Sequence, residues 1–212
     1  MEFKMRPRRN AFTLVEILVV ISVIGAMAAL VIPSLVGILR GSQLSTGIEI
    51  VFGVFSNARQ LGATTNHDIE VRLIEMKDPA SPSSTSQIRA LQMLEIREDG
   101  LPNQIGKTGM LPSGVIIGSP AEMTSLSALA NITASAADPS IPRVGRDYKY
   151  RSFRFRPDGS LDLHKKAKLS GVSNYFITLY DEKFSPRGGI PPANFATIQF
   201  ESATGATALY RP

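Results

Sequence analysis

The strongest constraint in the sequence is an apolar segment near the amino terminus. Residues Ile17–Leu39 form a run of 23 residues without a charged side chain, most of them Ile, Val, Leu and Ala. A helix of about 20 apolar residues is long enough to cross the hydrocarbon core of a bilayer. Four basic residues precede the run: Lys4, Arg6, Arg8 and Arg9. The positive-inside tendency places such a cluster in the cytoplasm, so we predict one anchor with most of the chain on the other side.

Composition narrows the classes of protein that this chain can be. With 43% apolar and 19% charged residues, most of its 212 residues should fold. The chain has no Cys, which excludes disulfides, thiolate zinc sites and thiol catalysis. The net charge is +5, but the first nine residues carry +3 of it. The remainder is therefore only slightly basic, and the charge balance gives little support for a nucleic-acid-binding protein.

Glu16 lies four residues into the apolar segment, which begins at Phe12. A charged side chain at the centre of a bilayer costs roughly 2.5–3.5 kcal/mol on insertion scales, so such residues are functional candidates. We considered three interpretations. The first is an ordinary signal anchor in which Glu16 is incidental. The second is a secretory signal cleaved after the small-x-small triplet Ala26-Met27-Ala28. The third is a processed leader, and it accounts for more of the residues.

The stretch Ala11-Phe12-Thr13-Leu14-Val15-Glu16 resembles the processing site of type IV prepilins and type II secretion pseudopilins. In that family a short basic leader is cut immediately before a Phe, the new terminus is methylated, and the fifth mature residue is Glu. Cleavage between Ala11 and Phe12 makes Glu16 the fifth residue. Pro33 becomes the twenty-second, where pilin helices commonly carry a proline, and we expect a kink there. The chain departs from the family in having Ala11 where Gly is usual, which bears on the efficiency of cleavage.

The resemblance implies partners and a location. A prepilin peptidase and methyltransferase would act on Ala11 and Phe12. Glu16 would pair with the Phe12 amine of a neighbouring subunit and set the axial register, because pairing relieves the cost of both charges in lipid. The other partners would be pilin or pseudopilin subunits and the lipid of the bacterial inner membrane. The chain would be single-pass, with its amino terminus cytoplasmic and its carboxy-terminal domain periplasmic.

The helical pattern continues beyond the apolar run. Apolar residues recur at spacings of three and four, as on one face of an amphipathic helix: Leu44, Ile48, Val51, Phe52, Phe55, Ala58 and Leu61. We therefore divide the chain into a leader at 1–11, a transmembrane and assembly helix at 12–39, an amphipathic continuation at 40–66 and a β-rich domain at 67–212. Gly37, Gly41 and Gly47 add to the expectation of kinks or a local break.

From Asp68 onward the sequence predicts strands, at 69–73, 91–96, 115–117, 148–155, 160–163, 175–180, 195–200 and 206–210. Ser119-Pro120-Ala121-Glu122 has the pattern of a helix start, so we expect a short helix ending near Ala130. The Ser/Pro-rich stretch 79–86 is expected to be a loop. The predicted fold class is α+β, with a long amino-terminal helix packed on an antiparallel sheet.

A second, looser resemblance concerns the β-rich part. The stretch Phe153-Arg154-Phe155-Arg156-Pro157-Asp158-Gly159 fits an F-x-x-x-G hairpin, and Ala203-Thr204-Gly205-Ala206-Thr207 fits a terminal TG turn. Both recur in minor pseudopilins of the type H kind. Many major pilins carry a disulfide-bounded terminal loop, which a chain without Cys cannot form. This departure favours a minor pilin or pseudopilin.

One stretch, RVGRDYKYRSFRFR, combines basic and aromatic residues, the ingredients of single-strand nucleic-acid binding. Its cations are Arg143, Arg146, Lys149, Arg151, Arg154 and Arg156. The favoured interpretation is structural, with the aromatics in a core and the cations in water. The alternation shifts by one at Ser152, which suggests a bulge and, unless the bulge resets them, sends Tyr148 and Tyr150 to the face opposite Phe153 and Phe155.

No feature of the sequence predicts an enzyme. His67 and His164 lack metal-ligand spacing, and Asp158 and Asp162 flank a turn where Asp commonly bonds locally. We expect no cofactor and no metal. The function that we predict is a structural subunit of a type II pseudopilus or type IV pilus-like filament. The alternatives are a DNA-binding minor pilin and a signal-anchored extracytoplasmic binding domain.

Overall fold

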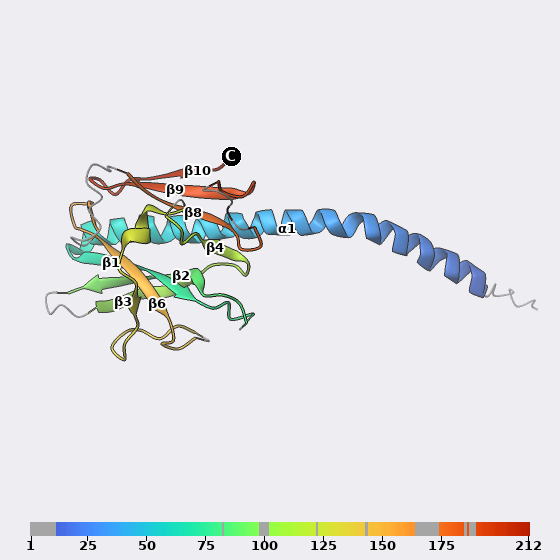
Figure 1. Cartoon of the computed structure of the whole chain (residues 1–212), viewed down its shortest axis with the longest axis horizontal. Helices are drawn as coiled ribbons and strands as arrows, with labels where there is room; N and C mark the ends of the chain where they lie inside the picture. Colours follow the sequence, from blue (N-terminus) through green and yellow to red (C-terminus); the bar gives the residue numbers. More distant parts are fainter. Residues whose placement is uncertain are drawn as a thin grey trace, which may run out of the picture. The chain divides into compact units, whose positions relative to one another are not determined.

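The computed structural model describes residues 12–81, 83–97, 102–121, 123–142, 144–163, 174–184, 186 and 190–212, without the side chains of residues 30–36. One long helix, α1 (Leu14–Thr65), is followed by an antiparallel sheet (Figure 1). The strands are β1 (Asp68–Met76), β2 (Gln87–Ile96), β3 (Pro102–Met110), β4 (Val115–Ile117), β5 (Ile132–Thr133), β6 (Lys149–Phe155), β7 (Leu161–Asp162), β8 (Asn174–Asp181), β9 (Phe195–Glu201) and β10 (Thr207–Tyr210). This confirms the predicted α+β class.

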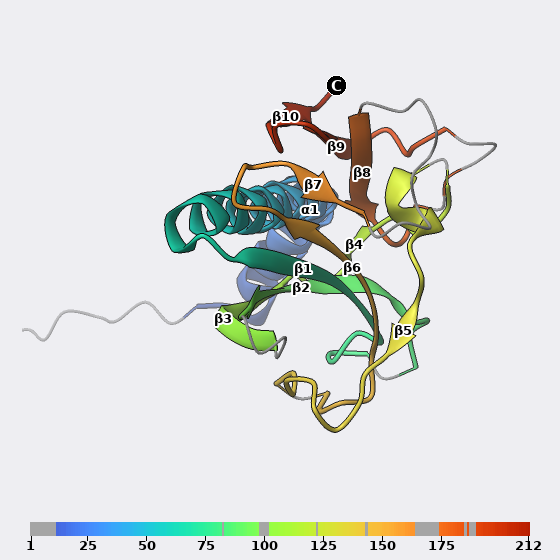
Figure 2. The ribbon, with the colours of Figure 1, turned by 90° about the vertical axis from the view of Figure 1, so that its left-hand side faces the viewer.

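The chain divides into two compact units, Met1–Arg40 and Gly41–Pro212. In the second unit the strand order is β10-β9-β8-β4-β2-β1-β6-β5, with β3 on β2 and β7 on β6. Viewed along the helix, this sheet passes around one side of the second part of α1, with β9 and β10 on one flank and β1, β2 and β3 on the other (Figure 2). Among the residues that the structure describes, no strand lies on the opposite side of this part of α1.

The main core lies between α1 and the sheet. The helix contributes a buried face that includes five of the predicted residues and Val54: Leu44, Ile48, Val51, Val54, Phe55 and Ala58. Phe52, also expected on this face, is 37% exposed, and Leu61 is only partly buried. Phe55 contacts two buried strand aromatics, with ring centroids 5.7 Å from Phe153 and 5.0 Å from Phe200. Burial of large apolar side chains is the main favourable contribution to folding, so this face fixes how α1 seats on the sheet.

A smaller core covers the other face of β1, β2 and β6, and includes Tyr148 and Tyr150. Beside it, the buried Arg72 donates hydrogen bonds to Glu70 and, through Nη1, to Asp138. The Arg72 guanidinium carbon lies 4.1 Å from the centroid of the Tyr150 ring. These contacts hold the loop around Asp138 onto the sheet.

Arg89 marks an irregularity in β2. Ile74 pairs with Ala90 while Glu75 pairs with Ile88, so Arg89 is the extra residue of a β-bulge. Its side chain is buried and donates from Nη2 to Oε1 of Glu182 at 2.6 Å, between the turns that follow β1 and β8. The bulge therefore directs a cation to a point where separate turns meet.

Three expectations about local structure were wrong. The expected helix over 119–130 is only a 3₁₀ turn at Ser125–Ala128, capped by Thr124. The amides of Met123 and Thr124 both donate to the carbonyl of Pro120, so the chain turns before Thr124 and then meets β8 through an isolated bridge between Thr124 and Ile177. Strands β3 and β5 had not been expected. Glu122, which was to close the capping box, lies outside the described residues.

The third error concerns Ser152, where a bulge was expected. The pairing of β6 with β1 runs from Phe155 opposite Ile69 to Lys149 opposite Glu75 without a shift. Because alternate residues of a strand point to opposite faces, Phe153 and Phe155 enter the main core. Tyr148 and Tyr150 enter the smaller core on the other face. The aromatics are therefore buried on both sides of the sheet, as the structural interpretation predicted.

Candidate functional site

The predicted processing site lies just before the start of α1. Phe12 is 74% exposed, and the helix begins two residues later. The Oγ1 of Thr13 accepts a hydrogen bond from the backbone N–H of Glu16 at 3.2 Å. Thr is a favoured N-cap, and a carboxylate in the first turn interacts well with the helix dipole. Thr13 and Glu16 therefore stabilise the helix start. Ala11 lies outside the described residues.

The first part of α1 presents apolar side chains to solvent on every side. The exposed fractions include 80% for Leu14, 53% for Ile17 and 63% for Met27. A helix that is apolar all round belongs in a larger core or in a membrane. Among the residues that the structure describes, no helix meets the length and hydropathy expected of a membrane span.

The expected kink at Pro33 stays a prediction. The helix is continuous from Leu14 to Thr65, so the local break that Pro33 and the following glycines suggested does not occur. The Pro33 side chain lies outside the described side chains.

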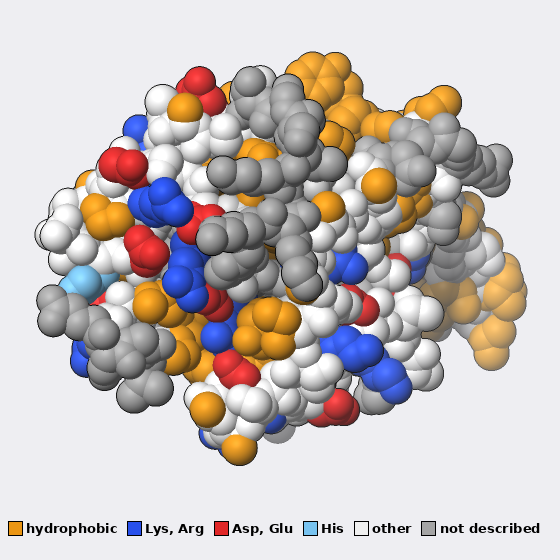
Figure 3. Space-filling view, turned by 60° about the vertical axis from the view of Figure 1, so that its left-hand side comes forward, with side chains coloured by type: hydrophobic (Ala, Val, Ile, Leu, Met, Phe, Trp, Pro, Cys, Tyr) orange, Lys and Arg blue, Asp and Glu red, His pale blue; other side chains and the backbone are white. Residues whose placement is uncertain are grey.

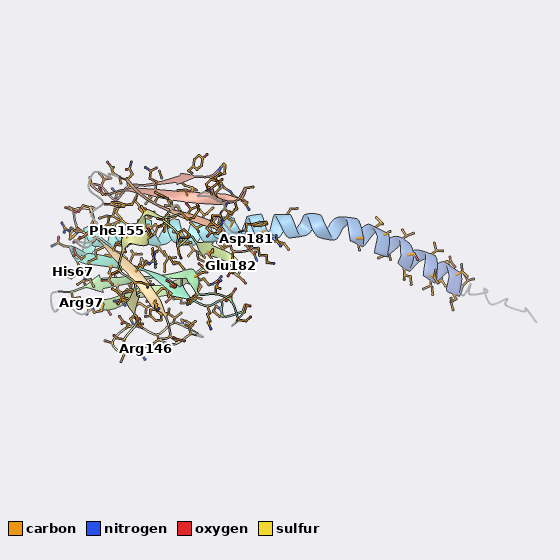
Figure 4. The ribbon with its side chains drawn as sticks, in the orientation of Figure 1. His67, Arg97, Arg146, Phe155, Asp181 and Glu182 are labelled. Atoms are coloured by element: carbon orange, nitrogen blue, oxygen red, sulfur yellow. The ribbon has the colours of Figure 1, made fainter. Side chains whose placement is uncertain are left out.

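The structure separates the cations that the sequence grouped as a nucleic-acid surface. Arg154 pairs with Glu70 at 3.3 Å, and Arg156 pairs with Asp162 at 2.8 Å. Arg146, at the lower edge of Figure 4, donates from Nε to the carbonyl of Asp138. Lys149 is exposed, and Arg143 lies outside the described residues.

Arg151 and Lys149 alternate with Arg154, so they point to the other face of β6. Nε and Nη1 of Arg151 are buried and have no hydrogen-bond partner among the described residues. On the face shown in Figure 3, Lys and Arg side chains lie among Asp and Glu instead of forming a continuous basic surface. The predicted cations are thus split between two faces, and three of them, Arg146, Arg154 and Arg156, are bonded to acceptors within the domain.

The two loosely matched turn motifs meet in space. Gly159 and Gly205 both have positive φ, 84° and 62°. A Cβ built on Gly205 would lie 2.3 Å from the carbonyl oxygen of Gly159 and 3.1 Å from the ring of Phe155. Between these turns and α1 lies a groove of about 300 Å³, to which Arg59 contributes. The F-x-x-x-G hairpin and the TG turn are therefore one packed unit beside the helix.

The acidic and His candidates make local contacts. His67 Nδ1 lies 2.9 Å from Oε1 of Glu95, and Arg97 donates to the other oxygen; Figure 4 shows His67 and Arg97 at one end of the domain. The hydrogen bond with His67 and then that with Arg97 lower the pKa of Glu95. Asp158 accepts two hydrogen bonds from Ser160, which lower the pKa of Asp158. No group of three or more potential ligands in the described ranges could hold a metal, and His164 lies outside them.

Two features of the site went unnoticed in the sequence. Thr13 stands three residues before Glu16, the spacing of an N-cap, so its role could have been anticipated. The Arg72–Asp138 pair could not, because 66 residues separate its members. Burial alone would raise the pKa of Asp138, but hydrogen bonds from Ser135 and Arg72 outweigh it and lower that pKa.

Residues 6–32 match the family model of the prokaryotic N-terminal methylation motif. The amino terminus of the chain carries a prokaryotic N-terminal methylation motif. The match includes Ala11, Phe12 and Glu16, and it confirms the resemblance to type IV prepilins and pseudopilins. A search of curated protein sequences finds no significant match.

Two solved structures resemble the fold. One is the minor pseudopilin EpsH from the type 2 secretion system of Vibrio cholerae, with 9% identity, a TM-score of 0.44, and coverage of 80% of this chain and 98% of that one. The other is the type IV minor pilin FimU of Pseudomonas aeruginosa, with 10% identity, a TM-score of 0.43, and coverage of 81% and 93%. No comparison supports the DNA-binding alternative.

Proposed function

We propose that this pilin-like chain is cut between Ala11 and Phe12 by a prepilin peptidase, methylated on Phe12, and assembled into a pseudopilus or pilus-like filament. The observation that carries the proposal is the match to the methylation motif over residues 6–32. With a cut after Ala11, Glu16 would be the fifth mature residue. The apolar surface of the first part of α1 supports it, because those side chains need lipid or other helices around them.

In this proposal, the unprocessed chain lies in the inner membrane with its basic leader in the cytoplasm. Cleavage exposes the Phe12 amine, which is protonated at neutral pH with a reference pKa of about 7.7–8.0. The Glu16 carboxylate of a neighbouring subunit then pairs with that amine, and each charge relieves the desolvation cost of the other. The peptidase supplies the covalent chemistry, and this chain is its substrate.

The first test is the mature amino terminus, measured by mass spectrometry on the full chain produced together with a prepilin peptidase. The proposal requires N-methylated Phe12. A start at Ala29 would identify a cleaved secretory signal, and an intact Met1 would identify a plain anchor; either result refutes it. Because the usual residue before the cut is Gly, an Ala11→Gly variant should be processed at least as completely as the parent chain.

A second test separates processing from assembly. Glu16→Gln removes the carboxylate but leaves the cleavage site, so we expect normal Phe12 methylation and loss of sedimentable filaments. Asp147→Asn is a matched control, because Asp147 is exposed and lies in the other unit of the chain. If Glu16→Gln assembled as well as Asp147→Asn, the proposed pairing of Glu16 would be wrong.

A further inference from the structure

A cavity of about 350 Å³, called here the Arg89 cavity, lies where the turns after β1 and β3 meet. Much of its lining is apolar and consists of Met76, Met110, Pro79, Pro112 and Pro142. Methionine side chains adapt to the shape of a ligand, and their sulfur atoms make favourable contacts with aromatic rings. Pockets for small ligands usually measure about 300–1,000 Å³, so this cavity has room for one large side chain and not for a folded surface.

The Arg89 guanidinium is the polar group that distinguishes this cavity, and the residue is only 3% exposed. Its Nη2 donates to Oε1 of Glu182 at 2.6 Å, and its Nη1 lies 3.9 Å from Oδ2 of Asp78; Glu182 is labelled in Figure 4. The Nε atom is buried and has no hydrogen-bond partner among the residues that the structure describes. A buried donor without an acceptor is unfavourable, so an occupant that supplies an acceptor gains a hydrogen bond there.

The charge of Arg89 is already balanced within the domain. Two carboxylates lie near its guanidinium, those of Glu182 at 2.6 Å and of Asp78 at 3.9 Å. The Asp78 carboxylate is held in place by Oγ of Ser113, which donates to Oδ2 at 3.0 Å. An anionic occupant would be repelled by both carboxylates, whereas a neutral carbonyl oxygen can accept from Nε without adding charge. The cavity therefore favours an uncharged acceptor.

A second cavity, of about 430 Å³, shares Met76, Asp78 and Pro79 with the Arg89 cavity. The two cavities therefore adjoin, and an occupant can continue from one into the other. An aromatic residue within a polypeptide supplies everything that the two require. Its ring provides a large apolar surface for the methionines and prolines, its backbone carbonyl is a neutral acceptor, and its flanking backbone extends beyond the first cavity.

We propose that the Arg89 cavity binds an uncharged peptide segment of another protein, with an aromatic side chain inside the cavity and a backbone carbonyl accepting a hydrogen bond from Nε of Arg89. The segment continues into the adjoining cavity. This binding site lies entirely within the domain Gly41–Pro212 and is independent of processing at Phe12.

The test uses methionine methyl NMR on the full chain in detergent, with N-acetylphenylalaninamide as the probe. The chain has seven methionines, few enough for each methyl signal to be assigned by a single Met→Leu substitution. The probe should shift the signals of Met76 and Met110, against which its ring would lie, with a dissociation constant of about 1 mM for a ligand of this size. The signals of Met93 and Met123, which pack in other clusters, should not move.

Two related probes separate the contribution of the ring from that of the carbonyl. N-acetylphenylalanine keeps the ring but carries a carboxylate, so it should bind about tenfold more weakly beside Glu182 and Asp78. N-acetylglycinamide keeps the carbonyls without the ring and should cause no shift at the same concentration. In the parent chain, the Nε–H signal of Arg89 should also move when N-acetylphenylalaninamide is added, which reports the proposed hydrogen bond itself.

Three variants locate the probe. Arg89→Met removes the donor and should weaken binding of N-acetylphenylalaninamide about tenfold. Ala80→Trp should block the cavity, because Ala80 is exposed and contributes to its lining. Ala136→Trp is the matched control and should bind as the parent does, since Ala136 is exposed and lines neither cavity.

Several results would overturn the proposal. The first is the absence of a shift at Met76 and Met110 at about ten times the expected dissociation constant. Equal binding of the acid and the amide would refute the neutral acceptor, and binding that survives Ala80→Trp would place the probe elsewhere. Methyl signals that change with the chain length of the detergent, and that the probe does not displace, would identify an acyl chain as the occupant instead of a peptide. None of these results depends on methylation of Phe12, so this proposal and the proposed function can fail separately.

Discussion

Gly205 offers the most direct test of the packing of the two turns. Replacement by Ala adds a Cβ that would lie 2.3 Å from the carbonyl oxygen of Gly159 and 3.3 Å or less from two carbons of the Phe155 ring. The backbone also has φ of 62°, in the left-handed region. That conformation costs a residue other than Gly about 1–2 kcal/mol. Overpacking of a filled site adds roughly 1–3 kcal/mol.

We therefore expect Gly205→Ala to lower the free energy of unfolding by about 2–5 kcal/mol, out of a typical total of about 5–15 kcal/mol. Gly106→Ala is the matched control, because Gly106 has φ of 70° and a Cβ added there would meet no atom within 4 Å. It should lose only the conformational cost of about 1–2 kcal/mol. Urea unfolding of the full chain in detergent, followed by tyrosine fluorescence, measures both. Equal losses would mean that the turns do not press on each other.

Three more predictions concern contacts described above. Thr13→Ala should speed hydrogen exchange at the first amides of α1, since loss of a cap costs about 0.5–2 kcal/mol. Glu182→Ala removes the 2.6 Å partner of the buried Arg89 guanidinium and leaves it only Asp78 at 3.9 Å, so it should destabilise by roughly 1.5–3 kcal/mol, and Arg89→Met by less. Asp138→Asn should cost about 1.5–3 kcal/mol at pH 7 in urea unfolding. Because the folded pKa of Asp138 is lowered, its contribution is present above the unfolded value of about 3.9 and is lost as pH falls through the folded pKa.

Each of these has a clear opposing result. Unchanged exchange at the amide of Glu16 would show that Thr13 does not cap α1. An Arg89→Met variant less stable than Glu182→Ala would show that the Arg89 stem, rather than its charge, stabilises the turns. If Asp138→Asn kept the parent's full loss of stability between pH 7 and pH 3, other carboxyl groups would account for it.

The periodic parts of the fold were predictable from the sequence. The spacing of Leu44, Ile48, Val51 and Phe55 predicted the buried face of α1, and it is the face that packs on the sheet. Strands rich in β-branched and aromatic residues, such as β8 and β9, were also expected. In both cases the pattern of side chains alone indicates which face is buried.

Elements held by distant partners were not predictable. Strand β3 contains Gly106, Lys107 and Gly109 and lacks alternation, and it is a strand because it pairs with β2. A Cβ on Gly109 would lie 3.0 Å from Ile50, so the glycine permits β3 to approach α1. The helix expected after Ser119 gave way to pairing with β8 in the same manner. The candidate processing site was identified from consecutive residues in the sequence. The pairing of Arg154, by contrast, depends on Glu70, 84 residues away.

The hydrogen bond between Arg211 and Ser45 joins residues 166 positions apart. The buried face of α1 in this region also needs β8 and β9, which supply Ile177, Leu179 and Ile198 to the same core. During synthesis, at about 5–20 residues per second, the face of α1 that packs on β8 and β9 therefore stays uncovered for roughly ten seconds or more. Contacts between residues so far apart in the sequence form slowly, and until they form the apolar surface is open to incorrect contacts. Newly made chains would depend on something else to shield α1 during that interval.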